Sequence, residues 1–301
     1  MRLRTKILSY IHRRFPFPLN GDAEISGGSP SCEISCIINF WGRLNLLEGI
    51  LYSLAEQDLP EKQVEVILVE DRGGTEEGRS AAKRFSSMLN VRYFALTEKF
   101  GVMGHSRNVG LSKATGRYIL LLDDDTVILQ KDFLAVMVKE FEQTSADAIV
   151  PRGSASFYLL KGRYGFHEPH FPTSRCMAYR AVALRDMGGF VSSIVGQEDV
   201  EFVIRYLTSG RLFYNSERLH YLHPPLIVNS LKKPAAVGRS FALLRKRYPF
   251  AVWVMLLLNG ARHAPLLLIP GSMKRRMQGR FGCGFLLGIY YALSGKTADY
   301  W

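Results

Sequence analysis

The sequence predicts an α/β fold in which a mostly parallel central sheet is flanked by helices. Apolar runs of strand length alternate with helical segments through residues 33–142, as expected for parallel strands joined by crossover helices. Two of these strands end in acidic residues, and ligands of open α/β sheets bind at the carboxyl ends of strands. A basic stretch at 225–301 predicts an additional C-terminal helical extension.

Each element of the sheet is predicted by its residue pattern. The isoleucine-rich run 33–40 follows a cluster of Gly, Ser and Pro, which favours a first buried strand. The second strand stops at Glu70 and Asp71, before the turn at Gly73 and Gly74. The expected elements in full are strands at 33–40, 64–69, 91–96 and 117–122 and helices at 45–53, 106–114 and 133–142.

The net charge of +12 is unevenly distributed along the chain. Residues 225–301 carry twelve Lys or Arg against one acid, and residues 1–20 carry five basic residues and no acid, whereas 21–224 sum to −4. We therefore expect a basic N-terminal leader at 1–30, a main domain at 31–224 and a basic, partly amphipathic helical region at 225–301. The basic ends alternate with aliphatic runs and lack spaced stacking aromatics, which favours an anionic membrane surface and no nucleic acid.

Apolar runs in the C-terminal region are expected to lie in a membrane interface. The runs 250–258, 264–269 and 281–293 are each shorter than the roughly 20 apolar residues that span a bilayer. Arginines and lysines flank them, and Trp253 and Tyr290 lie nearby, a composition typical of interfacial segments. The alternative is a helical subdomain that packs on the main domain and keeps its basic side chains in water.

The cysteine content favours a reducing compartment. The four cysteines are scattered, and no secretory leader with a small-residue cleavage site is recognisable. Cys32 and Cys36 are expected to be core residues, because no second Cys or His pair completes a zinc site. Together with the basic ends, this predicts a cytoplasmic protein that is peripheral on the inner face of the cell membrane.

Three consecutive aspartates, Asp123, Asp124 and Asp125, follow the buried run 118–122. Like charges crowded at a strand end are costly unless a cation meets them. Mn²⁺ or Mg²⁺ suits carboxylate oxygens, and these ions fill their remaining positions with water and ligand phosphates. The triplet therefore predicts a metal and nucleotide diphosphate site. The alternative is an acidic surface turn, and the second acidic strand end at Asp71 favours the site.

Several segments, in the same order, resemble the family-2 glycosyltransferases of the GT-A fold. The resemblance covers Ile34 to His223 and rests on ISCIINFWGRLNLLEGILYSLAEQ, VEVILVEDRGGTEEG, GHSRNVGLSKATGRYILLLDDD and RDMGGFVSSIVGQEDVEFVIRYLTSG. It implies a GT-A type sheet and transfer of a sugar from a nucleotide-sugar donor to an acceptor hydroxyl. The chain departs from the family pattern after the first strand and at residues 70–73, so the resemblance does not predict the donor's base.

The resemblance implies roles on the donor side. Asp71 would accept a hydrogen bond from the nucleotide base, Asp123 and Asp124 would bind the nucleotide sugar, and Asp125 with Asp123 would ligate Mn²⁺ or Mg²⁺. A divalent ion agrees with the chemistry, because the departing nucleoside diphosphate develops negative charge. Arg107 lies near a helix start and would neutralise the same phosphates, its alternative role being a surface ion pair.

On the acceptor side, the resemblance implies that Asp199 is the general base. It follows the Gly-Gly-Phe turn at 188–190, and attack by a hydroxyl needs a carboxylate that takes the proton. One base without a covalent nucleophile implies a single displacement with inversion. Glu198 is a possible support that could exchange roles with Asp199. His223 is implied as a late metal ligand, with His220 as its competitor because the alignment slips by one residue.

The sequence thus predicts an inverting, metal-dependent glycosyltransferase of cell-envelope polysaccharide biosynthesis that acts on a glycan or lipid-linked acceptor. One rival is a nucleotidyltransferase, although the chain has no Gly-rich triphosphate loop near its first strand. The other rival is a non-catalytic nucleotide-sugar-binding protein of the same fold. The intact Asp123, Asp125 and Asp199 argue against it.

Overall fold

The computed structural model describes residues 3–25, 29–60, 63–157, 162–165, 172–173 and 175–296. Contacts among these residues divide the chain into two compact units. We call one the sheet unit, Asn20–Ser192 with Arg211–Pro224, and the other the helical unit, Met1–Leu19 with Ser193–Gly210 and Pro225–Trp301. The expected linear boundaries after residues 30 and 224 stay predictions.

The sheet unit contains one sheet of eight described strands. Its order is β3-β2-β1-β4-β7-β5-β6, and β8 pairs with β5. Strands β3, β2, β1 and β4 are mutually parallel, whereas β7 is antiparallel to β4 and to β5. The strand bounds are β1 (Cys32–Phe40), β2 (Val64–Glu70), β3 (Asn90–Ala95), β4 (Gly116–Asp123), β5 (Ala148–Phe157), β6 (Gly162–Gly165), β7 (Cys176–Arg180) and β8 (Phe213–His223).

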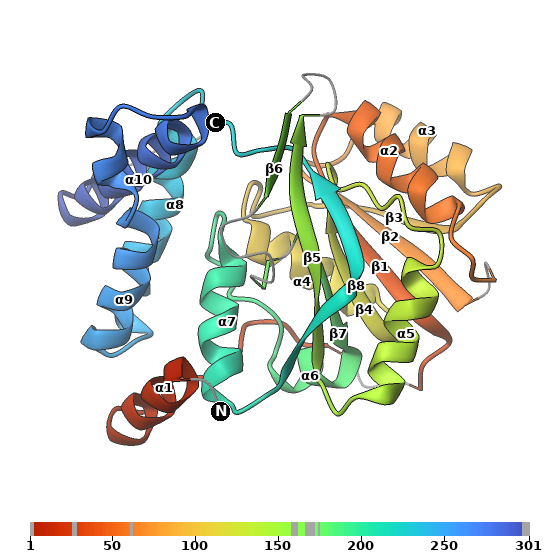
Figure 1. Cartoon of the computed structure of the whole chain (residues 1–301), viewed down its shortest axis with the longest axis horizontal. Coiled ribbons are helices and arrows are strands. Elements are labelled where there is room, and N and C mark those ends of the chain that lie inside the picture. Colours follow the sequence, from red (N-terminus) through yellow and green to blue (C-terminus); the bar gives the residue numbers. More distant parts are fainter. Residues whose placement is uncertain are drawn as a thin grey trace. The chain divides into compact units, whose positions relative to one another are not determined.

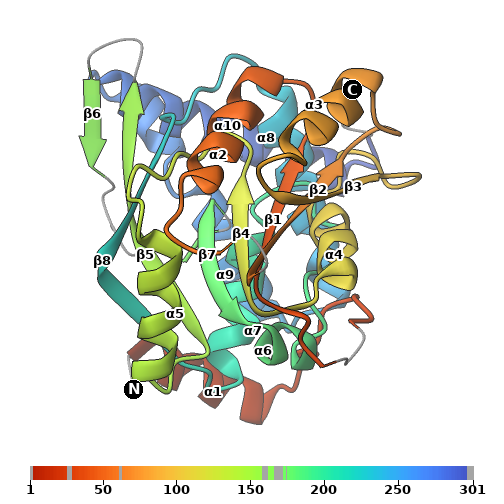
Figure 2. The same cartoon turned by 90° about the vertical axis from the view of Figure 1, so that its right-hand side faces the viewer.

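Helices cover both faces of this sheet, which confirms the predicted α/β class (Figures 1 and 2). Helix α2 turns Leu47, Ile50, Leu51 and Leu54 into the core, the spacing of an amphipathic helix. It shares one face with α3 and α5, while α4 and α6 lie on the other (Figures 1 and 2). The helix bounds are α2 (Leu44–Ala55), α3 (Glu76–Phe85), α4 (Met103–Lys113), α5 (Phe133–Gln143) and α6 (Ala181–Asp186).

Several elements go beyond those expected from the sequence. Helix α3 is capped by Thr75, whose hydroxyl accepts a hydrogen bond from the Gly78 amide at 2.9 Å. Strands β5 to β8 complete the sheet after α5. The register between β5 and β8 shifts between Val150 and Arg152, on either side of Pro151, which has no amide to donate to the ladder.

The helical unit is built on close helix packing. The Cβ positions of Gly238 in α8 and Gly288 in α10 would lie 2.0 and 1.9 Å from carbonyl oxygens of the facing helix, so only glycine fits there. Its helices are α1 (Leu3–Arg14), α7 (Glu198–Thr208), α8 (Lys232–Leu243), α9 (Phe250–Ala261) and α10 (Met273–Leu293), with 3₁₀ turns η2 (Leu244–Lys246) and η3 (Ala264–Leu268).

A buried ion pair joins the parts of the helical unit. Arg205 donates to both carboxylate oxygens of Glu201, at 2.7 and 2.9 Å, and both side chains are fully buried. Tyr248, which precedes α9, donates to the same carboxylate, and Arg205 also donates to the Leu19 carbonyl at 3.1 Å. Burial and the Glu201 charge raise the pKa of Tyr248, which keeps this donor protonated. Helix α7 is thus tied to the N-terminal segment and to the C-terminal helices.

One described stretch, Phe250–Leu268, is long and apolar enough to cross a membrane by length and composition. It has 19 residues, and an 18-residue window within it has a mean hydropathy of 1.4 and is 17% buried. From the sequence we expected two separate runs here, 250–258 and 264–269. In the structure a turn at Arg262 and His263 joins α9 to η3. Length and composition alone are weak evidence for a membrane span.

Candidate active site

The carboxyl ends of the central parallel strands bring the predicted donor-side residues to one edge of the sheet. Asn39 at the end of β1 pairs in register with Asp123 at the end of β4, and Phe40 pairs with Glu70 at the end of β2. The backbone amide of Asp71 donates to the Phe40 carbonyl at 3.0 Å. Asp71 and Asp123 therefore flank the end of β1, at the edge where α/β sheets bind ligands.

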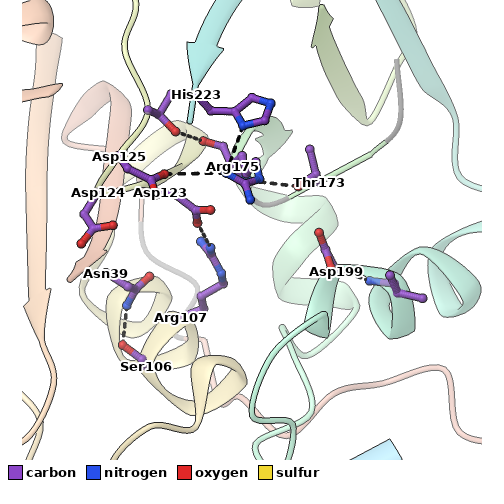
Figure 3. Close-up of polar contacts among 12 residues, drawn as sticks. Asn39, Ser106, Arg107, Asp123, Asp124, Asp125, Thr173, Arg175, Asp199 and His223 are labelled. Carbon is purple, nitrogen blue, oxygen red and sulfur yellow. Dashed lines mark hydrogen bonds and ion pairs between the residues drawn. The ribbon is translucent and has the colours of Figure 1, made fainter. Parts of the chain in front are cut away.

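Arg107 contacts the first aspartate of the triplet. Its Nη2 donates to Asp123 Oδ1 at 2.8 Å, and the arginine is 1% exposed (Figure 3). A buried guanidinium is costly unless a carboxylate compensates it. The alternative of a surface ion pair is therefore wrong. Arg107 extends from α4 to Asp123 and, from a buried position, forms an ion pair with it.

The next residue of α4 anchors the Gly-Gly-Phe turn. The Asn108 amide donates to the Phe190 carbonyl at 2.8 Å, and its oxygen accepts from the Phe190 amide at 2.8 Å. Gly188 and Gly189 have φ values of 58° and 60°, and a Cβ on Gly189 would lie 2.6 Å from the Asn108 oxygen. The Arg-Asn pair therefore connects the aspartates to this turn.

Arg43 contacts the other two aspartates. It donates to Asp125 Oδ2 at 2.9 Å and also to Asp124, whose side chain is 3% exposed. Burial alone would lower the pKa of Arg43, but the charges of Asp124 and Asp125 outweigh it and raise that pKa. The backbone of Arg43 is left-handed, with φ 45°, a conformation that is strained for a non-glycine residue and is common at functional sites.

Arg175 lies between Asp125 and His223 (Figure 3). Its Nη1 is 3.8 Å from Asp125 Oδ1 and 3.2 Å from His223 Nδ1. Its backbone carbonyl accepts from the Asp123 amide at 3.1 Å and from the Thr126 hydroxyl at 2.7 Å. Among the described residues, Arg43, Arg107 and Arg175 therefore bring positive charge next to the aspartate triplet.

His223 is buried and lies beside this cluster. Burial and the Arg175 charge lower the pKa of His223 to about 4, so the ring is neutral at pH 7. Its Nδ1 lies close to both Arg175 and the Pro224 carbonyl, and these contacts require opposite tautomers. Only the tautomer that donates to Pro224 leaves the Nε2 lone pair for a metal. The competitor His220 is exposed and lies 2.9 Å from the Ser154 hydroxyl.

Asp71 and Glu70 have separate environments. Glu70 is fully buried and accepts hydrogen bonds from the Thr75 amide at 3.0 Å, from the Thr75 hydroxyl at 2.8 Å and from Tyr93. Asp71 accepts from the amides of Arg72 and Gly101, both at 2.8 Å. Each carboxylate oxygen of Asp71 retains acceptor capacity for a ligand, because it has two lone pairs.

Glu198 and Asp199 begin α7 in the helical unit. Asp199 is half-buried, and its Oδ1 accepts from the Val200 amide at 2.8 Å (Figure 3). Glu198 is 2% exposed, and Gln197 before it has φ 59°. The structure thus gathers Arg107, the aspartate triplet and His223 in the sheet unit, and it places the two helix-start acids in the helical unit.

The carboxylate oxygens at this edge of the sheet suit a divalent cation that is bound by only a few protein ligands. Among the described residues, no three His, Cys, Asp or Glu side chains converge as a ready metal site. Asp125 Oδ1 is buried and has no hydrogen bond. Hard ions such as Mg²⁺ take only one or two carboxylates together with phosphates and water, so the residues present fit a cation that arrives with a diphosphate.

A cavity among the described residues lies elsewhere. It has a volume of about 280 Å³ and is lined by Thr115, Gly116 and Arg117 at the start of β4, together with Arg180 and Arg185. This is the amino end of β4, opposite the edge that carries the aspartates. We assign the chemistry to the carboxyl edge, where the carboxylates and arginines gather.

Comparison with known proteins agrees with this geometry. Residues 35–191 match the model of the glycosyl transferase family 2. The poly(ribitol-phosphate) beta-N-acetylglucosaminyltransferase TarS of Staphylococcus aureus (strain Mu50) is 24% identical over 209 residues, which is 63% of this chain and 35% of TarS. The chain therefore spans about a third of the length of this curated relative.

Two solved structures show the same fold. The mannosyltransferase PcManGT from Pyrobaculum calidifontis, in complex with GDP-Man and Mn²⁺, has a TM-score of 0.61 at 16% identity and covers 98% of this chain and 96% of its own. Residues 1–349 of S. aureus TarS in complex with UDP-GlcNAc have a TM-score of 0.56 at 20% identity and cover 87% of each chain. The predicted GT-A fold is confirmed, and because the family model matches more than half of its residues, this chain belongs to glycosyl transferase family 2.

Proposed function

We propose that this glycosyltransferase is an inverting, metal-dependent enzyme that transfers a sugar from a nucleotide-sugar donor to a hydroxyl of a glycan or lipid-linked acceptor. The observation that carries the proposal is the Arg107–Asp123 pair at the carboxyl end of β4, next to Asp124 and Asp125. The family match sets aside the nucleotidyltransferase alternative.

The donor is proposed to bind along the ends of β1, β2 and β4. Asp71 accepts a hydrogen bond from the base, and Asp123 and Asp124 bind the nucleotide sugar. Arg107 neutralises phosphate charge from beneath the strand end. The complexes of TarS with UDP-GlcNAc and of PcManGT with GDP-Man support a nucleotide-sugar ligand for this fold.

The cofactor is proposed to be Mn²⁺ or Mg²⁺, held by Asp125 with Asp123. His223, in its Nδ1–H tautomer, is proposed as a further ligand that would have to move toward the bound cation, because the three side chains do not converge in this structure. A divalent ion at the diphosphate stabilises the charge of the leaving group as a Lewis acid. The complex of PcManGT with Mn²⁺ supports this cofactor. Arg43 and Arg175 compensate the same carboxylates when no ligand is bound.

Asp199 is proposed as the general base. Its carboxylate takes the proton of the acceptor hydroxyl while that oxygen bonds to the anomeric carbon, and the bond from this carbon to the diphosphate oxygen breaks. One displacement from the opposite side inverts the anomeric configuration. Glu198 supports this helix start from a buried position.

The site of action is proposed to be the cytoplasmic face of the cell membrane, in cell-envelope polysaccharide biosynthesis. The +11 charge of residues 225–301 supports attraction to anionic lipid. The name of TarS, a poly(ribitol-phosphate) beta-N-acetylglucosaminyltransferase, supports a polymer as the acceptor class.

A thermal-shift panel tests the donor site first. UDP, GDP, CDP and dTDP are each added with and without Mn²⁺ or Mg²⁺ to wild type, to Asp125→Asn and to the control Asp58→Asn, which removes an exposed carboxylate elsewhere. A ligand at a concentration of about 100 times its dissociation constant should raise the free energy of unfolding of the protein by about 2.7 kcal/mol. We expect a metal-dependent shift with one diphosphate that is lost only in Asp125→Asn. No shift with any diphosphate, from folded protein, would contradict the donor site.

A further inference from the structure

We infer that the stretch 265–276, which runs from η3 into the first turn of α10, is the surface by which this protein docks on an anionic phospholipid bilayer. The inference rests on the membrane location proposed above and gives it a specific surface and partner. Its first support is exposure: Leu267, Leu268, Ile269 and Met273 are 46%, 86%, 51% and 53% exposed. Four large apolar side chains within seven residues are a costly surface in water and a favourable one in a lipid interface.

The charge next to these side chains matches an anionic bilayer. Arg275 and Arg276 follow Met273 after Lys274 and are exposed. Residues 225–296 contain no Asp or Glu, so no acid of this region opposes anionic headgroups. Each basic residue near an anionic membrane surface strengthens binding by about fivefold, and apolar insertion adds to this attraction.

The exposed stretch is held in place by close packing. Cβ atoms on Gly279 and Gly282 of α10 would lie 2.6 Å from the Leu267 amide nitrogen and 2.5 Å from the Ala264 amide nitrogen. These contacts leave no room for a side chain between α10 and η3. The apolar side chains are therefore presented on a fixed backbone, so little ordering entropy is lost on docking.

The same unit carries the candidate base. Tyr248 donates to Glu201 in α7, the helix that begins at Glu198 and Asp199, and α10 packs directly on α8 through Gly284 and Gly288. Docking of 265–276 therefore places the helix of Asp199 in a bilayer-bound unit. This arrangement suits an acceptor that is itself anchored in the membrane.

Vesicle flotation tests the docking surface without donor or acceptor, so it can fail independently of the sugar-transfer proposal. The full chain is mixed at low salt with phosphatidylcholine vesicles containing or lacking 30% phosphatidylglycerol. The variants are Leu268→Glu and the double variant Arg275→Gln/Arg276→Gln. The matched controls are Leu129→Glu, at a leucine that is 70% exposed in the sheet unit, and Lys131→Gln/Lys139→Gln, which removes two exposed charges there.

We expect wild type to bind the anionic vesicles and to be released by high salt. Leu268→Glu should weaken binding at least tenfold and the double arginine variant roughly 30-fold, while both controls bind as wild type does. Thermal melting checks that each variant is folded.

Several outcomes would overturn the inference. The first is that folded wild type does not bind anionic vesicles. The second is that Leu268→Glu binds them as strongly as wild type does. The third is that the sheet-unit controls lose as much binding as the variants in 265–276. Binding that resists salt and alkaline carbonate and yields only to detergent would point instead to a span through Phe250–Leu268. A dimer in solution that Leu268→Glu dissociates would identify a second copy as the occupant.

Discussion

Arg43 donates a hydrogen bond to Asp125 Oδ2 at 2.9 Å, although the two residues are 82 positions apart in the chain. In the proposed mechanism, the same Asp125 carboxylate binds a divalent cation. The Arg43 side chain is 52% exposed, so water can replace its contacts with the aspartates. If a divalent cation binds at Asp125 as proposed, the arginine and the cation would compete for the same negative charge.

This competition predicts the behaviour of Arg43→Gln. Without metal, the variant should be less stable than wild type by about 1 kcal/mol, because Asp124 and Asp125 lose a charged partner that is itself half-exposed. Added Mn²⁺ should then stabilise the variant more than it stabilises wild type. Thermal unfolding with and without Mn²⁺ measures both effects. The control is Arg84→Gln, which removes the exposed pair with Glu48.

If Mn²⁺ stabilised wild type and Arg43→Gln against thermal unfolding by the same amount, this would contradict a competition between Arg43 and the cation. If Mn²⁺ stabilised Arg84→Gln as much as Arg43→Gln, the effect would come from the loss of any exposed positive charge and not from the contact with Asp125. The comparison is informative because Arg84 is 56% exposed and resembles Arg43 in solvent access.

Asn108→Ala tests the link between α4 and the Gly-Gly-Phe turn. The substitution removes two hydrogen bonds to the Phe190 backbone, whose amide is then left buried without its partner. We expect a loss of about 2–3 kcal/mol in the free energy of unfolding. Urea denaturation measures it, with the exposed Asn45→Ala as the control. A loss below about 0.5 kcal/mol would mean that the turn does not depend on this amide.

The sequence predicted the parts of the fold and site that depend on local patterns. The buried strands before Asp71 and Asp123 were expected from their apolar runs, and their acidic ends meet at one edge because parallel strands run the same way. Cys36 is buried in the core, as expected, whereas Cys32 is only partly buried, and all four cysteines are free. The class of enzyme followed from the order of several motifs, and the family match confirms it.

The sequence did not predict features that depend on contacts between distant segments. Arg43 and Arg175 carry no local signal, because their carboxylate partners lie 82 and 50 positions away. Strand β8 was missed because its polar and charged residues interrupt the apolar alternation of FYNSERLHYLH. Helix α3 was missed because most of its residues are polar, although its Thr75 cap and acidic first turn were a readable start signal.

Glu65 predicts a pH dependence of stability. Burial alone would raise the pKa of this carboxyl, but hydrogen bonds from Ser35, Thr115 and Arg92 outweigh it and hold the pKa below its usual value of 4.5. A carboxyl whose folded pKa is depressed stabilises the fold above its unfolded pKa, and this contribution is lost as the pH falls through the folded pKa.

Glu65→Gln should therefore be less stable than wild type at pH 7, by about 1.5–3 kcal/mol, because it loses charged hydrogen bonds. The difference should begin to shrink below about pH 4.5, where the unfolded chain takes up the proton on Glu65, and should be smallest once the pH has fallen through the depressed folded pKa. Urea denaturation between pH 3 and pH 7 measures the difference, with the exposed Glu56→Gln as control. A difference that is constant with pH would exclude ionised Glu65 as its source.

Asp199→Asn tests the proposed chemistry directly. The amide cannot take the proton of the acceptor hydroxyl, so the turnover number should fall by about 10²–10⁴-fold. The metal-dependent thermal shift with the donor diphosphate should be retained, because the proposed donor site consists of Asp71, Arg107 and the aspartate triplet in the sheet unit.

Glu198→Gln is the matched variant for this test, because it makes the same change one position earlier. Glu198 is 2% exposed, so we expect its loss to lower stability more than turnover. If Glu198→Gln abolishes transfer while Asp199→Asn retains wild-type turnover, the two acids have exchanged roles. If both variants transfer sugar normally, neither is the base. Proton NMR of the product of wild type reports the anomeric configuration, and retention would exclude a single displacement assisted by either carboxylate.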